Sequence, residues 1–159
     1  MSQVKDHEFL REALRLADAN TESMAGGPFG AVVVRDGQII GRGANQVLET
    51  KDPTAHAEMV AIRAASRHLN HWELTDCTLY TSCEPCPMCL AAAYWARVGR
   101  IVFAADRHDA AAVGFDDDFL YRELVVPADT RQLPTLQDLA GEGRQVMERW
   151  AAHPGRVPY

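Results

Sequence analysis

Four residues of types that bind metals or move protons stand at short spacings in two parts of the chain. His56 and Glu58 lie two positions apart in TAHAEM, and Cys86 and Cys89 lie three apart in PCPMC. Thiolates three residues apart share one face of a helix and form half of a zinc site. A histidine third ligand would leave the fourth zinc position open for water, as catalytic sites do. The pattern predicts a zinc site held by His56, Cys86 and Cys89, with Glu58 beside it.

Two helix starts would bring these residues together. Thr54 is a good N-cap for a helix expected over 55–69, and the prolines of EPCPMC suit the start of a second helix that runs to about residue 97. Residues two apart on a helix point about 200° away from each other, so His56 and Glu58 cannot share a side face. Both can reach a point just beyond the helix end, and we expect the two ends to lie side by side.

The cysteines admit other interpretations. Cys86 and Cys89 could be buried apolar residues or a redox pair, and Cys83 could complete a closed structural site with three cysteines and one histidine. Pro85 favours an extended residue before it. Cys83 is therefore expected at the end of a strand over 77–82 and not on the helix face.

The remaining elements frame these motifs. Further helices are expected over 6–19, near 117–123 and over 135–151, further strands over 31–35, 38–43 and 101–105, and loops over 44–53 and 106–119. Asp36-Gly37 supplies a hairpin turn. Strands separated by single helices favour a three-layer α/β fold, in which helices sandwich a mixed β-sheet. No repeat or linker is evident, so residues 1–159 are expected to form a single domain.

Charge and composition limit the class of protein. Sixteen basic and 22 acidic residues give a net charge of −6, which makes nucleic acid an unlikely partner because phosphate binding needs clustered Lys and Arg. No stretch reaches 18 apolar residues, so neither a membrane span nor a signal peptide is expected. The chain is expected in the cytoplasm, where clustered cysteines indicate metal binding or catalysis more than disulfides.

His56-x-Glu58 followed by Pro85-Cys86-x-x-Cys89 is the signature of zinc-dependent deaminases. In that chemistry zinc lowers the pKa of a bound water toward about 7. Glu58 would move protons as general acid and base while an exocyclic amine leaves an aromatic ring as ammonia. A zinc-stabilised binding module without activity is the alternative from another class, and it would need no proton carrier at Glu58.

Longer segments resemble bacterial guanine deaminases of the cytidine-deaminase superfamily. The resemblance is carried by GGPFGAVVV, DPTAHAEMVAIR, LYTSCEPCPMCLAAAYWAR and GFDDDFLYREL, and it extends to the terminal tyrosine. It implies a cytidine-deaminase-like fold, one Zn²⁺ per subunit, and the hydrolysis of the purine base guanine to xanthine and ammonia.

The same resemblance implies a set of substrate-binding residues. They are Asn45, Phe29, Ala57, Trp95, Asp117 and Tyr159. Asn45 would hold the polar edge of the base, and Asp117 would accept from its N–H edge and relay protons, with Asp116 as the alternative. Otherwise Asn45 could be a turn residue, Phe29 and Trp95 core aromatics, and the acidic run a solvated loop.

The last ten residues, about 150–159, contain prolines and a glycine that prevent a helix at their end. A frayed terminus is the default for such a segment. The resemblance instead implies a homodimer in which this segment is swapped between subunits and Tyr159 closes the partner's site.

Other enzymes of the same fold remain alternatives. A tRNA adenosine deaminase shares the zinc motif, but it must bind phosphates, which the net charge of −6 disfavours. A guanosine or cytosine deaminase would share the chemistry. Riboflavin-pathway deaminases usually carry a reductase domain, for which 159 residues leave no room. Aminated triazines, which resemble the six-membered ring of guanine, are a further candidate substrate.

Overall fold

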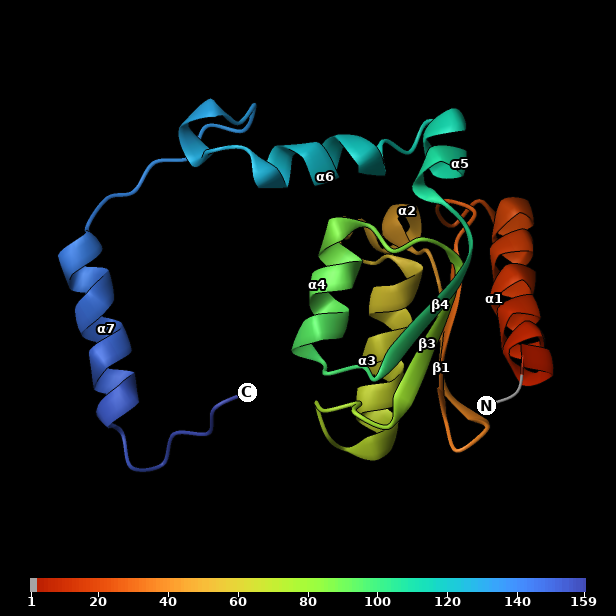
Figure 1. Ribbon diagram of the computed structural model, residues 1–159, viewed down its shortest axis with the longest axis horizontal. Helices are drawn as coiled ribbons and strands as arrows, with labels where there is room; N and C mark the ends of the chain where they lie inside the picture. Colours follow the sequence, from red (N-terminus) through yellow and green to blue (C-terminus); the bar gives the residue numbers. More distant parts are fainter. Residues whose placement is uncertain (1–2) are drawn as a thin grey trace. The chain divides into compact units, whose positions relative to one another are not determined.

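The computed structural model describes residues 3–159 (Figure 1). Their contacts divide the chain into two compact units, unit 1 (Met1–Tyr121) and unit 2 (Arg122–Tyr159). The single domain expected over the whole chain stays a prediction. No helix among the described residues is long and apolar enough to cross a membrane.

Unit 1 is built on a four-stranded mixed sheet with the strand order β2-β1-β3-β4. The strands are β1 (Gly30–Arg35), β2 (Gln38–Ala44), β3 (Cys77–Cys83) and β4 (Arg100–Ala105). β1 pairs antiparallel with β2 and β3, whereas β3 pairs parallel with β4. Asp36 and Gly37 both have positive φ angles, as the predicted hairpin turn requires.

Helices cover both faces of this sheet (Figure 1). α1 (Gln3–Ser23) lies on the face where Tyr80 is buried, and α3 (Ala57–Leu69) and α4 (Pro87–Trp95) lie on the face where Leu79 is buried. Leu79 and Tyr80 are neighbours on β3, and successive strand residues point to opposite faces. The predicted three-layer α/β fold is therefore confirmed.

α3 approaches β2 closely because glycines and alanines make the contact. A Cβ on Gly43 would overlap the carbonyl oxygen of Ala57, and a Cβ on Gly41 would overlap that of Ala61. Both alanines are fully buried. This close packing fixes where the first turn of α3 lies relative to the sheet.

The start of α3 differs from the expectation. The N-cap is His56 and not Thr54, because the Thr54 hydroxyl donates to Oδ1 of Asp52 at 2.7 Å. The expected loop 44–53 contains one helical turn, α2 (Val47–Thr50).

The expected loop 106–119 is also partly wrong. It contains α5 (Arg107–Ala112), and α6 (Asp117–Val125) follows. Asp106 caps α5, because its carboxylate accepts from the backbone N–H of Asp109 at 3.0 Å while the Asp109 carboxylate accepts from Asp106. This reciprocal pair is a capping box.

Unit 2 comprises the end of α6, a 3₁₀ turn at Ala128–Thr130 and α7 (Ala140–Ala152). α7 begins at Ala140 and not at 135, because Leu139 has a left-handed φ of 50°. No residue of unit 2 is buried. Its exposed large apolar side chains are those of Leu124, Val125, Leu133, Leu136, Leu139, Val146, Met147, Trp150, Val157 and Tyr159.

Candidate active site

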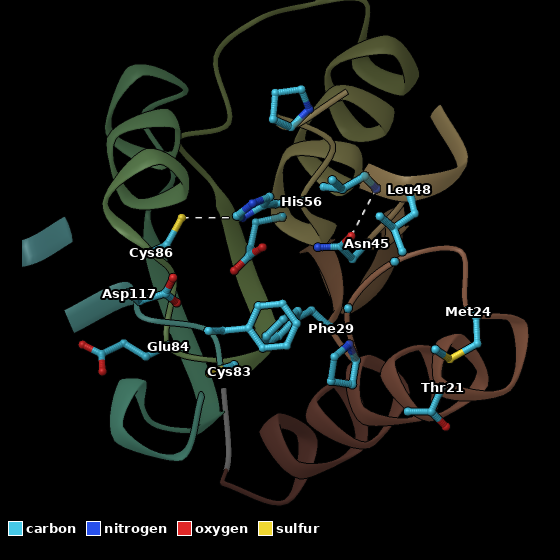
Figure 2. Close-up of a pocket in the computed structure, with 17 residues that line it drawn as sticks. Thr21, Met24, Phe29, Asn45, Leu48, His56, Cys83, Glu84, Cys86 and Asp117 are labelled. Carbon is cyan, nitrogen blue, oxygen red and sulfur yellow. Dashed lines mark hydrogen bonds between the residues drawn. The ribbon is translucent and has the colours of Figure 1, made fainter. Parts of the chain in front are cut away.

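The N-termini of α3 and α4 bring the two signature motifs together. His56 is the N-cap of α3, Cys86 is the N-cap of α4, and Cys89 lies in the first turn of α4. Nδ1 of His56 lies 3.6 Å from Sγ of Cys86 (Figure 2). The same nitrogen lies 3.6 Å from Sγ of Cys89. His56, Cys86 and Cys89 form a candidate metal-binding group, which we call the ligand group. Each residue offers one ligand atom, and the three atoms lie within 4.8 Å of one another.

The three donor atoms fit a tetrahedral zinc ion. Zn–S and Zn–N bonds of about 2.3 and 2.0 Å, at tetrahedral angles, separate the nitrogen from each sulfur by roughly 3.5 Å. The separation here is 3.6 Å. A hydrogen bond from Cys89, together with the nearby His56, holds the pKa of Cys86 well below its ordinary value. A thiolate, which is the form that binds zinc, is therefore favoured at this position.

Cys83 stands apart from this group. It is the last residue of β3, as predicted, and its thiol donates to the carbonyl oxygen of Asp106 at 3.5 Å. Burial raises the pKa of Cys83 to about 11, so its sulfur is protonated at neutral pH. The geometry thus favours a three-ligand site over a closed four-ligand one.

Glu58 lies beside the ligand group and is only 6% exposed. Its Oε2 accepts from the thiol of Cys89 at 3.5 Å, and its Oε1 accepts from the hydroxyl of Thr81 at 3.3 Å. Burial raises the pKa of Glu58, because a low-dielectric setting disfavours the charged form. A carboxyl group in this setting is suited to taking up and returning a proton.

A cavity of about 620 Å³ opens beside these groups (Figure 2). Five polar residues predicted from the sequence line it together, namely Asn45, His56, Glu58, Cys86 and Asp117. Phe29, also predicted, lines it with Phe115, and the two rings meet edge to face with centroids 4.8 Å apart. Sequence reasoning missed Phe115, and its position directly before the acidic run is the only local signal for it.

The structure separates the two aspartates that the sequence left as alternatives. Asp117 is the first residue of α6 and lines the cavity. Burial, and then the nearby Cys86, raise the pKa of Asp117. Asp116 instead accepts from the backbone N–H of Phe119 at 3.0 Å, which is the role of a helix N-cap.

Asn45 makes a turn contact and also lines the cavity, and its substrate-binding role stays a prediction. Its Oδ1 accepts from the backbone N–H of Val47 at 3.1 Å, which is a turn contact. Its side chain is buried and lines the cavity. Asn20 fixes the backbone here, because its Nδ2 donates to the carbonyl oxygens of Asn45 and Gly27 at 2.9 and 2.6 Å.

The substrate-binding roles of three further residues implied by the resemblance stay predictions. Ala57 is fully buried between His56 and Glu58, where it packs against β2. Trp95 is the last residue of α4 and is 63% exposed. Tyr159 belongs to unit 2 and is exposed.

Comparison with known proteins agrees with this geometry. The model of the cytidine and deoxycytidylate deaminase zinc-binding region matches residues 3–105, which include both signature motifs. The chain belongs to this deaminase family. It is accordingly a zinc-dependent aminohydrolase, and the predicted fold class is that of the family.

Individual relatives extend the match beyond residue 105. Guanine deaminase of Bacillus subtilis is 48% identical over 97% of this chain and 99% of its own length. An X-ray structure of guanine deaminase from that species has a TM-score of 0.94 at 46% identity, covering 100% of this deaminase and 99% of that chain.

More distant relatives match a smaller part of the chain. The tRNA-specific adenosine deaminase of Haemophilus influenzae is 40% identical over 72% of this chain and 68% of its own length. A solved protein in complex with 2,6-diaminopurine has a TM-score of 0.66 at 37% identity, covering 69% of this deaminase and 61% of that chain.

Proposed function

We propose that this deaminase hydrolyses guanine to xanthine and ammonia. The observation that carries the proposal is the convergence, in one cavity, of two zinc-ligand candidates (His56 and Cys86), Glu58, Asp117 and the ring pair of Phe29 and Phe115. The end-to-end similarity to a guanine deaminase supports the choice of base.

His56, Cys86 and Cys89 would hold one Zn²⁺ per subunit. Zinc in a three-ligand site acts as a Lewis acid and lowers the pKa of a bound water. The chain's own contribution is a soft donor set at two helix N-termini, and these N-termini favour negatively charged ligands.

Glu58 would be the general acid and base. Its carboxylate would take one proton from water and give it to the ring nitrogen beside the carbon under attack. It would then take the remaining proton from the newly added hydroxyl group and give it to the departing amine, which leaves a carbonyl group on the ring. The C–O bond forms at the carbon that bears the amine, the C–N bond to that amine breaks, and ammonia leaves. The Thr81 hydroxyl holds Oε1 of this carboxylate, and Oε2 lies on the side of Cys89 and the ligand group.

Asp117 and Asn45 would fix the orientation of the base in the cavity. Guanine presents ring and amine N–H donors on one edge, and the Asp117 carboxylate at the cavity wall is an acceptor for them and a candidate proton relay. The Asn45 oxygen is used by Val47, so its amide nitrogen is the group that would donate to the acceptor atoms of the base. Phe29 and Phe115 would pack on the ring.

The enzyme would work as a homodimer that exchanges its C-terminal segment. Unit 2 buries no residue of its own and exposes apolar side chains along α7, including Val146, Met147 and Trp150. Such a surface in a monomer favours association. Tyr159 would then close the partner's cavity. We place the enzyme in the cytoplasm, where reducing conditions keep thiols available for zinc.

A tRNA adenosine deaminase is the main alternative, since one matches much of the chain. Glu84 and Asp117 line the cavity, and Asp116 directly precedes Asp117 in the sequence. Phosphates would therefore meet carboxylates there. Guanosine and cytosine are alternatives within the same fold. A binding module without activity would have to bury the Glu58 carboxyl to no purpose, which is costly.

The test is ammonia release from guanine, guanosine, cytosine, adenine and adenosine in parallel, with metal content measured on the same sample. Xanthine formed from guanine alone would support the proposal. Turnover of guanosine or cytosine instead would retain the zinc chemistry and overturn the choice of substrate. No turnover by the zinc-loaded protein would count in favour of an RNA substrate or a structural zinc.

A further inference from the structure

Tyr121 connects the helix that carries Asp117 to the loop that carries Cys86. It lies four residues after Asp117 on α6, so the two side chains share one helix face. Its hydroxyl donates to the carbonyl oxygen of Pro85 at 2.8 Å, and Pro85 directly precedes Cys86. A single hydrogen bond thus spans from α6 to the start of α4.

Arg107 fixes the Tyr121 ring from the side of α5. The guanidinium carbon lies 4.3 Å from the ring centroid, which is a cation–π distance. The same guanidinium pairs with Glu84 at 3.3 Å, and the backbone N–H of Arg107 donates to the other Glu84 oxygen at 3.1 Å. Glu84 and Pro85 are adjacent, so Arg107 and Tyr121 both hold the segment that leads into Cys86.

We propose that Tyr121, braced by Arg107, is a positioning residue that sets the distance of Asp117 from the zinc-ligand group. Asp117 occupies the first turn of α6, so the orientation of this helix decides where its carboxylate lies. The Tyr121–Pro85 hydrogen bond fixes that orientation one turn further along. The positioning role depends on the proposed function in one respect only, namely which base Asp117 binds.

A mutant cycle on the zinc-loaded, full-length enzyme tests the proposal. Tyr121→Phe removes the hydroxyl and keeps the ring, and it is expected to lower kcat/KM for guanine about 10-fold, a typical cost of one misplaced hydrogen bond. In an Asp117→Asn background the same change is expected to have less than about a 2-fold effect, because its target is already lost. Multiplicative losses in the double variant would overturn the proposal.

Two further variants isolate the contact. Arg107→Lys keeps a positive charge near Glu84 but loses the flat guanidinium over the ring, and it is expected to show the same non-additivity with Asp117→Asn. Tyr94→Phe removes a hydroxyl from an exposed tyrosine on α4. It is the matched control and is expected to leave kcat/KM unchanged. The zinc content of Tyr121→Phe, Arg107→Lys and Tyr94→Phe is expected to equal that of wild type.

Amide hydrogen exchange gives a readout that needs no substrate. Peptides covering residues 115–125 are expected to exchange faster in Tyr121→Phe than in wild type or Tyr94→Phe. Unchanged exchange there would overturn the positioning role even if guanine is turned over. Faster exchange in an enzyme that is inactive on guanine would support the positioning role and count against the proposed function alone.

Discussion

The hydroxyl of Thr81 lies 3.3 Å from Oε1 of Glu58, and both side chains are buried. Thr81→Val replaces the donor with a methyl group of similar size and leaves the Glu58 oxygen without it. We expect a loss of about 1–3 kcal/mol in stability and about a 10-fold fall in kcat with little change in KM. Thr81→Ser keeps the hydroxyl and is the matched control. Equal kcat values for the valine and serine variants would contradict this role.

Glu58→Gln should separate binding from chemistry. The amide is close to the carboxyl group in shape but cannot carry a proton between water, ring and amine. General acid–base catalysis contributes roughly 10²–10⁴-fold, so kcat is expected to fall by at least that much while zinc content and fold are kept. Steady-state kinetics and metal analysis on one preparation check this. Substantial residual turnover would rule out Glu58 as the proton carrier.

Cysteine substitutions should distinguish a three-ligand from a four-ligand site. Cys86→Ser is expected to lose most bound zinc, whereas Cys83→Ser is expected to keep one zinc per subunit, because the Cys83 thiol donates to a carbonyl group. Elemental analysis after dialysis against a weak chelator measures this. In wild type, a strong chelator should abolish activity and added Zn²⁺ should restore it. Zinc loss in both variants would favour the closed site.

Complementation tests the exchanged tail. Glu58→Gln and Tyr159→Ala are each expected to be impaired alone. If a site combines Glu58 of one chain with Tyr159 of the other, each mixed dimer contains one intact site. Random pairing then restores about a quarter of wild-type activity. Subunit exchange must be shown for the mixed sample. If activity does not recover in that sample, either both residues act within one chain or Tyr159 is not part of the site.

Acid stability should depend on Asp6. Hydrogen bonds from Arg100 and then Tyr80 lower the pKa of Asp6 to about 2, against about 3.9 for an unfolded aspartate. A lowered folded-state pKa stabilises the protein above the unfolded value, and this stabilisation disappears as pH falls from about 4 toward 2. Asp6→Asn should therefore be less stable than wild type at pH 6, with the gap closing near pH 2–3. Urea unfolding of both proteins at pH 6 and near pH 2–3 measures the difference in their free energies of unfolding. A difference that does not change with pH would contradict the prediction.

The sequence predicted the centre of the site better than its edges, for a physical reason. The metal ligands and Glu58 lie in short motifs at helix starts, where local spacing determines position. The cavity wall depends on contacts between distant segments, such as the ring pair of Phe29 and Phe115, which no local pattern encodes. Trp95 lies six residues after Cys89, about 240° around the helix, and its substrate-binding role stays a prediction.

The missed helix and the misplaced cap have local causes. The Asp106–Asp109 capping box was present in the sequence of the expected loop, but the neighbouring glycine and acids favour a loop in any simple pattern. Thr54 is of a residue type that caps helices, but its hydroxyl donates a hydrogen bond to the Asp52 carboxylate instead. In both cases one side-chain hydrogen bond decided between two locally acceptable structures.

The contact between β2 and α3 has a consequence for mutational tolerance. Backbone lies against backbone there, because Gly41 and Gly43 offer no side chain that could adjust. A single added methyl group at Gly43 would have to displace α3 as a rigid rod, and His56 at its end would move with it. A saturation screen for deaminase activity should therefore find a line of intolerant positions along β2 that contact neither metal nor substrate. Such losses would resemble active-site lesions, although the chemical groups of the site would all be intact.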